Sequence, residues 1–146
     1  MRKSLLKILM GLVGAILGYA IVSAVYEFRH TQTPPDARLA LNARLARVAA
    51  NMNERLPLLA DPETRLDKVT AGPGAQLTYA FTLPNRDKGT LDLPAFEKAI
   101  RQNLINNYQT NSSLAELRAA QVKLDYQYKD KNGQFISEIA VTPKDF

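Results

Sequence analysis

The longest apolar stretch of the chain lies close to its N-terminus. No charged residue interrupts the run from Ile8 to Tyr26, and three basic residues precede it: Arg2, Lys3 and Lys7. At about 1.5 Å per helical residue, a helix over residues 8–26 spans roughly the 30 Å hydrocarbon core of a bilayer. The pattern predicts a single-pass helix in a bacterial inner membrane. Because basic residues favour the cytoplasmic side, we expect a cytoplasmic N-terminus and a periplasmic C-terminal domain.

A cleaved signal peptide is the alternative interpretation of the same stretch. Val22-Ser23-Ala24 offers small or tolerated residues at the two positions that a signal peptidase inspects. The apolar run is longer than a usual signal core and continues past Ala24 without a polar break. The length favours an uncleaved signal-anchor over residues 1–30, and cleavage near Ala24 stays open.

Small residues cluster on one side of the predicted membrane helix. At 100° per residue they fall within a narrow sector, and they include one GxxxG pair: Gly11, Gly14, Ala15 and Gly18. Small residues allow a second helix to approach closely in lipid, although glycine and alanine are also common in membrane helices. The sector predicts a helix-packing interface with a larger integral membrane protein or with a second copy of this chain.

A short linker over residues 31–35 leads into a predicted domain over residues 36–146. Tandem prolines at Pro34 and Pro35 resist helix, and the apolar positions that follow have helical spacing up to Pro57. These apolar positions are Leu41, Leu45, Val48, Met52 and Leu56. Basic residues occupy a different face of this helix: Arg44, Arg47 and Arg55. They are candidate contacts for lipid headgroups, and the solvated face of an amphipathic helix explains them equally well.

The next segment predicts a first β-hairpin. A strand over residues 64–70 precedes the Gly72-Pro73-Gly74 reversal, and a second strand follows it. In the second strand apolar side chains alternate with smaller or polar ones, which predicts one buried face; these are Leu77, Tyr79, Phe81 and Leu83. Leu66 and Val69 have opposite parity, so we expect a β-bulge in the first strand.

A second helix is expected to begin near Asp92, with Pro94 in its first turn. One side of this helix is apolar: Phe96, Ala99, Ile100, Leu104 and Tyr108. Ser113 and Glu116 have the spacing of a capping box, which predicts a short further helix to about Ala120.

The closing segment predicts a second hairpin. Alternation from Val122 to Tyr128 runs into Asn132-Gly133, a favoured two-residue turn. That turn would place Tyr128 opposite Ser137, with the following apolar pairs in register: Tyr126 with Ile139, and Leu124 with Val141. The other face would pair Gln127 with Glu138. Hydrophobic pattern and turn chemistry therefore select the same register.

The element order α-β-β-α-(α)-β-β predicts the α+β class. Two hairpins that each bury one face, and two main helices that each bury one stripe, fit a small two-layer domain. We expect an antiparallel four-stranded sheet with both main helices on one face.

Composition limits the chemistry available to this domain. The chain has 146 residues, no cysteine and one histidine, His30, which lies just outside the membrane span. Thiolate nucleophiles, cysteine-ligated zinc and Ser-His triads are therefore excluded. Of the net charge of +5, the first 30 residues carry +3, so the predicted domain is nearly neutral. We expect no cofactor, no metal and no nucleic-acid partner.

Three groups in the domain could be considered as sites, and each also has a structural explanation. The densest acidic cluster is Asp61, Glu63 and Asp67, which turn formation explains. The start of a calcium loop at Asp130-Lys131-Asn132-Gly133 lacks the further ligands. Core packing explains an aromatic set: Tyr79, Tyr126, Tyr128 and Phe135. Exposed edges of the sheet could still bind an extended segment of a partner.

Several segments together give the chain a resemblance to a family of small bacterial exported proteins without an established activity. They are Leu56-Pro57, the Asp61–Asp67 turn and strand, Leu77-Thr78-Tyr79, and the hairpin from Tyr126 to Ile136. The resemblance covers most of residues 41–146 and implies a signal peptide or membrane anchor before a domain that ends in a tyrosine-rich hairpin. The family pattern also implies a disulfide between the end of the second main helix and the C-terminus. This chain has no cysteine at either place, so its C-terminus must be held in another way.

These observations favour a non-catalytic, single-pass accessory protein of the inner membrane. The membrane helix would pack against a larger membrane protein complex and present the small periplasmic domain. The alternative is a periplasmic binding protein or immunity-type protein that blocks a toxin or another ligand. An enzyme is the least favoured class, because no catalytic constellation is visible.

Overall fold

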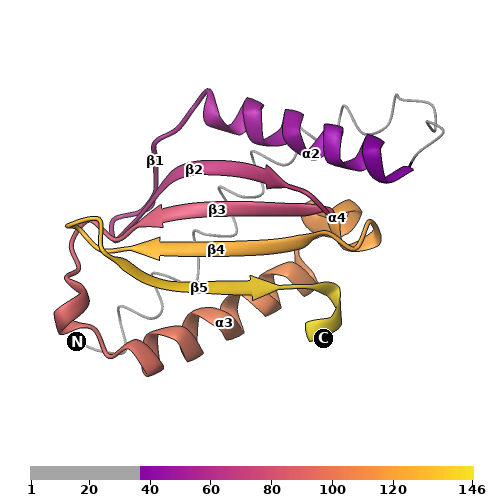
Figure 1. The fold of residues 1–146 in the computed structure, drawn as a ribbon. Coiled ribbons are helices and arrows are strands. Elements are labelled where there is room, and N and C mark those ends of the chain that lie inside the picture. The colour runs from indigo at the N-terminus through magenta and orange to yellow at the C-terminus, as the bar shows by residue number, and fades with distance from the viewer. Residues whose placement is uncertain (1–36) are drawn as a thin grey trace.

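The computed structural model describes residues 37–146, which form one helix-covered β-sheet (Figure 1). The predicted membrane helix over residues 8–26, its packing residues Gly11, Gly14, Ala15 and Gly18, and the linker over residues 31–35 lie outside the described residues. The helices are α2 (Ala37–Asn53), α3 (Leu93–Thr110) and α4 (Ala115–Ala119). The strands are β1 (Leu58–Asp61), β2 (Thr64–Gly72), β3 (Gln76–Thr82), β4 (Lys123–Lys129) and β5 (Phe135–Val141).

The α+β class is confirmed, but the prediction of a four-stranded antiparallel sheet is wrong. The sheet has five strands in the order β1-β2-β3-β4-β5, and β3 and β4 run parallel while the other neighbours are antiparallel. After β3 the chain crosses through α3 and α4 and enters β4 from the end at which β3 began (Figure 1). A crossover of this kind is what parallel neighbours require. The sequence predicted both hairpins, but it did not predict that β3 and β4 pair in parallel.

Strand β1 has no counterpart among the sequence predictions. It contains only four residues, Leu-Leu-Ala-Asp, which show no alternation, and it follows Pro57 directly. Helix α2 ends at Asn53, earlier than the predicted Leu56, and the chain continues through a turn into Pro57. The residue before a proline disfavours helix, which is consistent with the earlier end.

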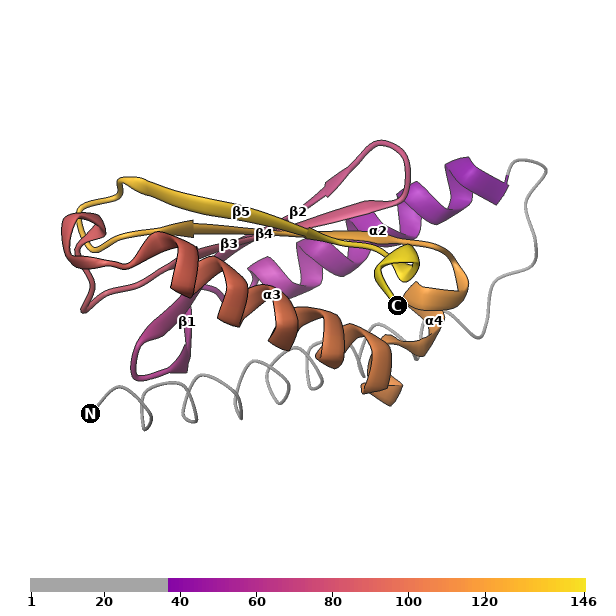
Figure 2. The same ribbon diagram turned by 90° about the horizontal axis from the view of Figure 1, so that it is seen from below.

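One face of the sheet carries the core. In β3 the buried side chains are Leu77, Tyr79 and Phe81, and their neighbours in β4 are Leu124, Tyr126 and Tyr128. Both main helices contribute to the same cluster, α2 through Leu45, Val48 and Met52, and α3 through Ile100, Leu104 and Tyr108. Helix α2 lies against β2 and β3, and α3 lies against β5 (Figure 2). The predicted two-layer arrangement therefore describes the helix-bearing face correctly.

The first hairpin contains the bulge that the sequence predicted. The register between β2 and β3 shifts between Leu66 and Lys68, so Asp67 is the extra residue. Leu66 and Val69 are both buried although their parity differs. The bulge places both side chains in the core.

The second hairpin confirms most of the predicted register. Tyr128 pairs with Ser137, Gln127 with Glu138 and Tyr126 with Ile139. The predicted two-residue turn is wrong: Asp130 pairs with Gln134 around a three-residue loop, in which Gly133 has a φ of 78°. The extra residue shifts the register by one, so that Lys129 faces Phe135.

The side chain of Phe135 is 51% exposed, and the expectation that it joins the aromatic core is therefore wrong. The two-residue turn would have given Phe135 the same parity as the buried Ser137. In the observed structure the pairing shifts by one residue between Ser137 and Phe135, which breaks the alternation of faces. The Phe135 side chain therefore does not lie on the buried face with Ser137.

The predicted start of the second main helix is confirmed, whereas the predicted capping box is wrong. Asp92 caps α3 by accepting a hydrogen bond from the Ala95 N–H through its carboxylate. Further along, the Asn111 side chain, not Ser113, accepts the hydrogen bond that starts the turn before α4. Asn111 lies one residue after α3 and therefore serves the following turn as well.

The C-terminus is held by an aromatic contact. The rings of Tyr108, near the end of α3, and Phe146 pack edge to face with centroids 6.0 Å apart. The resemblance described above implies a crosslink between these same two regions. In this chain a ring contact joins them instead.

Candidate functional site

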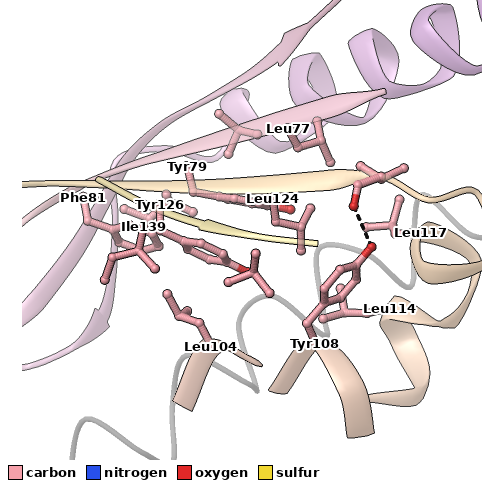
Figure 3. Close-up of a cluster of buried hydrophobic side chains, with 14 of the residues drawn as sticks. Leu77, Tyr79, Phe81, Leu104, Tyr108, Leu114, Leu117, Leu124, Tyr126 and Ile139 are labelled. Atoms are coloured by element: carbon pink, nitrogen blue, oxygen red, sulfur yellow. Dashed lines mark hydrogen bonds between the residues drawn. The ribbon is translucent and has the colours of Figure 1, made fainter. Parts of the chain in front are cut away.

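Three members of the predicted aromatic set lie in the core: Tyr79, Tyr126 and Tyr128. Figure 3 shows Tyr79 and Tyr126 among the buried side chains. The rings of Tyr79 and Tyr126 stack with centroids 5.4 Å apart, and those of Phe81 and Tyr128 with centroids 5.3 Å apart. Burial raises the pKa of Tyr79, Tyr126 and Tyr128 well above the ordinary value. These rings are therefore not available to a ligand on the surface, as core packing predicted.

The phenol groups of this core differ in their partners. The Tyr108 hydroxyl donates a hydrogen bond of 2.8 Å to the carbonyl of Val122 (Figure 3). The hydroxyls of Tyr79 and Tyr126 are buried and have no hydrogen-bond partner within residues 37–146. A buried hydroxyl without a partner costs free energy, so these two tyrosines contribute through their rings.

The predicted acidic cluster does not form a catalytic arrangement. Glu63 forms an ion pair of 3.0 Å with Arg86, whereas Asp67 pairs with Arg65 and accepts a hydrogen bond from the Thr82 hydroxyl. The third carboxylate, Asp61, accepts a hydrogen bond from the Glu63 N–H within the turn. The three carboxylates of the cluster therefore serve separate structural contacts. Within residues 37–146, no group of three histidine, cysteine or acidic side chains is arranged to hold a metal ion.

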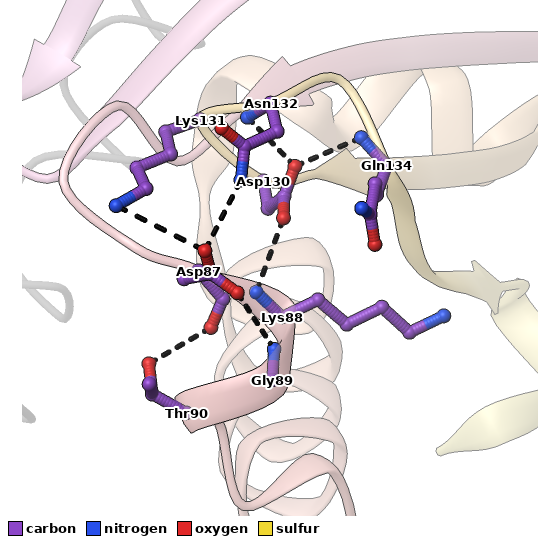
Figure 4. A network of polar contacts seen from close by, with 8 residues as sticks. All are labelled: Asp87, Lys88, Gly89, Thr90, Asp130, Lys131, Asn132 and Gln134. Atoms are coloured by element: carbon purple, nitrogen blue, oxygen red, sulfur yellow. Dashed lines mark hydrogen bonds and ion pairs between the residues drawn. The ribbon is translucent and has the colours of Figure 1, made fainter.

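The segment that resembles the start of a calcium loop is a turn bonded to residues 87 and 88 (Figure 4). The buried carboxylate of Asp130 accepts hydrogen bonds from the backbone N–H groups of Lys88, Asn132 and Gln134 at 2.8–3.1 Å. Burial opposes ionisation of Asp130, but these three donors outweigh it and hold the pKa below its ordinary value. Asp87 binds the other side of the loop, through Asn132 at 3.1 Å and Lys131 at 3.9 Å. The carboxylates stabilise the loop, and this use explains their spacing.

The candidate lipid contacts do not form one helix face. Arg44 and Arg47 lie on α2, Arg44 half-buried and Arg47 exposed, whereas Arg55 lies in the turn beyond the end of α2. Contact of these residues with headgroups stays a prediction. No helix within residues 37–146 combines the length and the apolar character needed to cross a bilayer.

The sheet face opposite the helices is polar, and it contains one shielded carboxylate. Asp125 in β4 is fully buried, and its only charged neighbour among the described residues is Lys123, at 3.0 Å. Beyond this ion pair, neither carboxylate oxygen of Asp125 has a hydrogen-bond partner among the described residues. Its strand neighbours Thr78 and Ala140 are half-buried. This face therefore offers hydrogen-bonding groups.

The edge of β5 is covered by α3. The Arg101 guanidinium donates a hydrogen bond of 3.3 Å to the carbonyl of Ala140, and the Ser137 hydroxyl donates one of 2.7 Å to the Glu97 carboxylate. Figure 1 shows α3 running alongside β5. A strand from another protein would have to displace these contacts.

The edge of β2 beyond β1 is covered by α2. The Asn53 side chain donates to the carbonyl of Val69 at 2.7 Å and accepts from the Val69 N–H at 2.9 Å. Both backbone groups of Val69 would otherwise be unpaired, because β1 pairs only with residues 64–66 of β2. Asn53 thus takes the place of a neighbouring strand at this position.

Among the described residues, nothing covers the outer edge of β1 in this way. No hydrogen bond from another part of residues 37–146 reaches its outer side. The side chains of Leu58 and Leu59 are 43% and 57% exposed. Sequence reasoning predicted exposed sheet edges but missed this strand. The one available signal was the pair of adjacent leucines between a proline and an acidic turn.

The β1–β2 turn also contains buried polar atoms without partners. Asp61 is 4% exposed and Thr64 is 2% exposed, and the two residues face each other across the turn. In the part of the chain that the structure describes, one carboxylate oxygen of Asp61 and the Thr64 hydroxyl have no hydrogen-bond partner. This hairpin is therefore less completely satisfied than the Asp130 loop at the opposite edge.

Comparisons with known proteins identify the fold. No family model and no curated protein sequence matches the chain. A predicted secreted protein of Pseudomonas aeruginosa has a similar structure, with a TM-score of 0.61 and 18% identity over 71% of this chain and 90% of its own. EpsS, the type 2 secretion pilotin of Vibrio vulnificus, gives a TM-score of 0.60 and 10% identity over 73% of this chain and 92% of its own.

A third similar structure is AspS, a type II secretion pilotin of Vibrio cholerae, with a TM-score of 0.56 and 14% identity over 75% of this chain and 94% of its own. The matches cover nearly the whole of each of the three chains. The fold of the described residues therefore corresponds to nearly the entire fold of each of these three proteins. At these identities the likeness concerns the fold alone.

Proposed function

We propose that this chain is a non-catalytic accessory protein that tethers a pilotin-like domain to the bacterial inner membrane and docks it on a larger membrane protein complex. The observation that carries the proposal is the fold, which the chain has in common with two pilotins of type II secretion systems. The predicted helix over residues 8–26 supplies the tether, with its N-terminus in the cytoplasm and the domain in the periplasm. The resemblance to exported proteins agrees with this location.

The contacts of the domain are of a kind that suits docking. Its carboxylates are used in turns, ion pairs and helix caps, as Asp130, Glu63 and Asp92 show. Backbone and apolar groups remain available at the edge of β1, where Leu58 and Leu59 are exposed. Such groups bind another polypeptide and do not activate a substrate.

The test is the mass of the native assembly. The full chain, expressed at its natural level, is extracted from membranes in a gentle detergent and weighed by native mass spectrometry. The proposal predicts a stoichiometric complex with a larger membrane protein. A solitary monomer would contradict it. If residues 31–146 alone then bound a soluble protein, the periplasmic immunity-type alternative would replace the proposal.

A pair of variants tests the contribution of the membrane helix. Gly14→Leu fills the predicted helix-packing sector, whereas Val13→Leu changes the neighbouring position outside that sector. We expect Gly14→Leu to reduce the fraction of chain in the complex and Val13→Leu to leave it unchanged. Equal effects of the two variants would show that the sector of small residues does not form the packing interface.

A further inference from the structure

The β4–β5 loop contains the one asparagine of the chain that a glycine follows. Asn132 and Gly133 are both exposed, and open space surrounds the position that a Cβ of Gly133 would occupy. Asparagine is among the thermally labile residues, and glycine lacks the side chain that would hinder a reaction between the two. Sequence and exposure therefore place a chemically labile pair at the tip of this hairpin.

The reaction open to such a pair is deamidation. The backbone nitrogen of Gly133 attacks the side-chain carbonyl carbon of Asn132, and the side-chain nitrogen leaves as ammonia together with the proton of the attacking nitrogen. Water then opens the resulting succinimide ring at either of its two carbonyl groups, and the product is aspartate or isoaspartate. The reaction consumes one water molecule and needs no enzyme.

Hydrogen bonds hold both reacting groups in the closed loop (Figure 4). The Gly133 N–H donates to the Asp130 carbonyl at 3.0 Å, so the attacking nitrogen is engaged. The side-chain amide of Asn132 donates to the Asp87 carboxylate at 3.1 Å, and the Asn132 N–H donates to the Asp130 carboxylate at 2.8 Å. Because the amide carbon must turn toward the Gly133 nitrogen, the loop has to open before the ring can close.

We propose that Asn132 is a site of spontaneous deamidation whose rate is set by opening of the β4–β5 loop. Each opening breaks the hydrogen bonds to Asp87 and Asp130 and makes the pair reactive. The product does not restore the closed loop, because a carboxylate replaces the donor of position 132 and faces two further carboxylates. Lys131 is the one cation that forms an ion pair with Asp87 within residues 37–146. Deamidation therefore converts a transient opening into a lasting one.

The loop also joins the hairpin to the segment that precedes α3. The Lys131 N–H donates to the Arg86 carbonyl at 3.0 Å, and the Lys88 N–H donates to the Asp130 carboxylate at 3.1 Å. A modified loop would loosen this junction, whereas the buried side chains of β4 and β5 stay in the core. We therefore expect a local change at one end of the sheet and not unfolding of the domain.

The test follows position 132 by peptide mass spectrometry while the full chain is incubated in gentle detergent at neutral pH. Asp87→Ala removes the acceptor of the Asn132 amide. Asp145→Ala is the matched control, because Asp145 caps a different turn, at the C-terminus. We expect deamidation of Asn132 to be about tenfold faster in Asp87→Ala than in the unsubstituted chain, and unchanged in Asp145→Ala. Equal rates in the two variants would overturn the role of the loop.

The unsubstituted chain supplies a second comparison, which does not depend on any variant. Deamidation of Asn132 should be at least about tenfold slower in the folded chain than in the chain unfolded in urea. Equal rates in the two states would show that the closed loop does not protect the amide. An Asn132 that stays unmodified in the unfolded chain would overturn the assignment of the site.

A further pair of variants tests the effect of the product on the loop. Asn132→Asp reproduces one product of the reaction, whereas Asn132→Ala removes the donor without adding a charge. Hydrogen exchange of residues 130–134 should be faster in Asn132→Asp than in Asn132→Ala, and residues 135–141 should stay protected in both variants. Equal exchange of residues 130–134 would contradict the lasting opening, because the added carboxylate would then have no effect.

Discussion

The two edges of the sheet are finished in different ways. At one edge β5 lies beside α3, its Ser137 hydroxyl donates to Glu97, and the hairpin that ends in it closes on the Asp130 loop. At the other edge β1 has four residues, two exposed leucines and a turn with unpartnered polar atoms at Asp61 and Thr64. The edge at β5 is thus bonded to a helix, whereas the edge at β1 exposes apolar side chains.

The two edges differ in how much of the core depends on them. The β4–β5 hairpin takes part in the core, so a new contact there would disturb packing. Strand β1 buries Ala60 but leaves Leu58 and Leu59 exposed. Low stability and high exposure at one place are typical of binding segments.

The largest expected contrast comes from truncating one apolar side chain at each edge. Ile139→Ala in β5 removes a side chain that is 1% exposed and should lower the free energy of unfolding by about 3 kcal/mol. Leu59→Ala in β1 should change it by less than about 0.5 kcal/mol. Urea denaturation of both variants measures the difference. Similar losses would show that β1 belongs to the core.

The next effect concerns the Asp130 loop and its dependence on pH. The folded-state pKa of Asp130 lies below the ordinary value of 3.8, so its stabilisation is present above that pH and is lost as pH falls through the folded pKa. Asp130→Ala should be less stable at neutral pH and should lose less on acidification. Denaturation midpoints between pH 7 and pH 2 test this, with Glu138→Gln as an exposed control. An acid limb unchanged in Asp130→Ala would contradict the assignment.

A smaller effect is expected where α2 covers the edge of β2. Asn53→Ala leaves the N–H and carbonyl of Val69 without their two hydrogen bonds, and the expected loss is about 2 kcal/mol. Asn51→Ala, on the exposed side of the same helix, is the control. Equal stability of the two variants would mean that water replaces Asn53 at no cost.

Two hydroxyl groups should respond with opposite signs. The Thr64 hydroxyl near β1 is buried without a partner, so Thr64→Val is expected to raise stability by up to about 1 kcal/mol. The Ser137 hydroxyl in β5 donates to Glu97, and Ser137→Ala is expected to lower stability by about 1 kcal/mol. Thermal denaturation distinguishes the signs. A loss in Thr64→Val would indicate that its hydroxyl has a partner in solution.

The smallest effect is expected at Arg101. Its hydrogen bond to the Ala140 carbonyl is exposed, so Arg101→Ala should cost no more than about 0.5 kcal/mol. Amide exchange in β5 should rise only slightly, because α3 still covers the strand. A large rise would show that Arg101 alone closes this edge.

The sequence predicted those parts of the fold in which two local signals agree. Hydrophobic alternation and turn residues both specify the register of β4 with β5, and the parity of Leu66 and Val69 specifies the bulge in β2. The errors lie where one extra residue or a distant partner decides the outcome. The loop around Gly133 contains one residue more than predicted, and the parallel pairing of β3 with β4 depends on the path through α3.

The candidate site was harder to predict than the fold, because a sheet edge is defined by what fails to cover it. Asn53 and Arg101 protect their edges only because α2 and α3 place them beside Val69 and Ala140. No local pattern marks either residue for that role. Strand β1 is too short for alternation, so its two leucines could be noticed in the sequence but not assigned to an edge.

The central claim is that β1 is the edge used for recognition in the membrane. Hydrogen exchange of the full chain, measured by mass spectrometry in native membranes and again after dissociation in strong detergent, tests it directly. We predict that residues 58–61 are protected in the membrane and exchange rapidly after dissociation, whereas residues 135–141 stay protected in both states. Rapid exchange of residues 58–61 in both states would contradict the account.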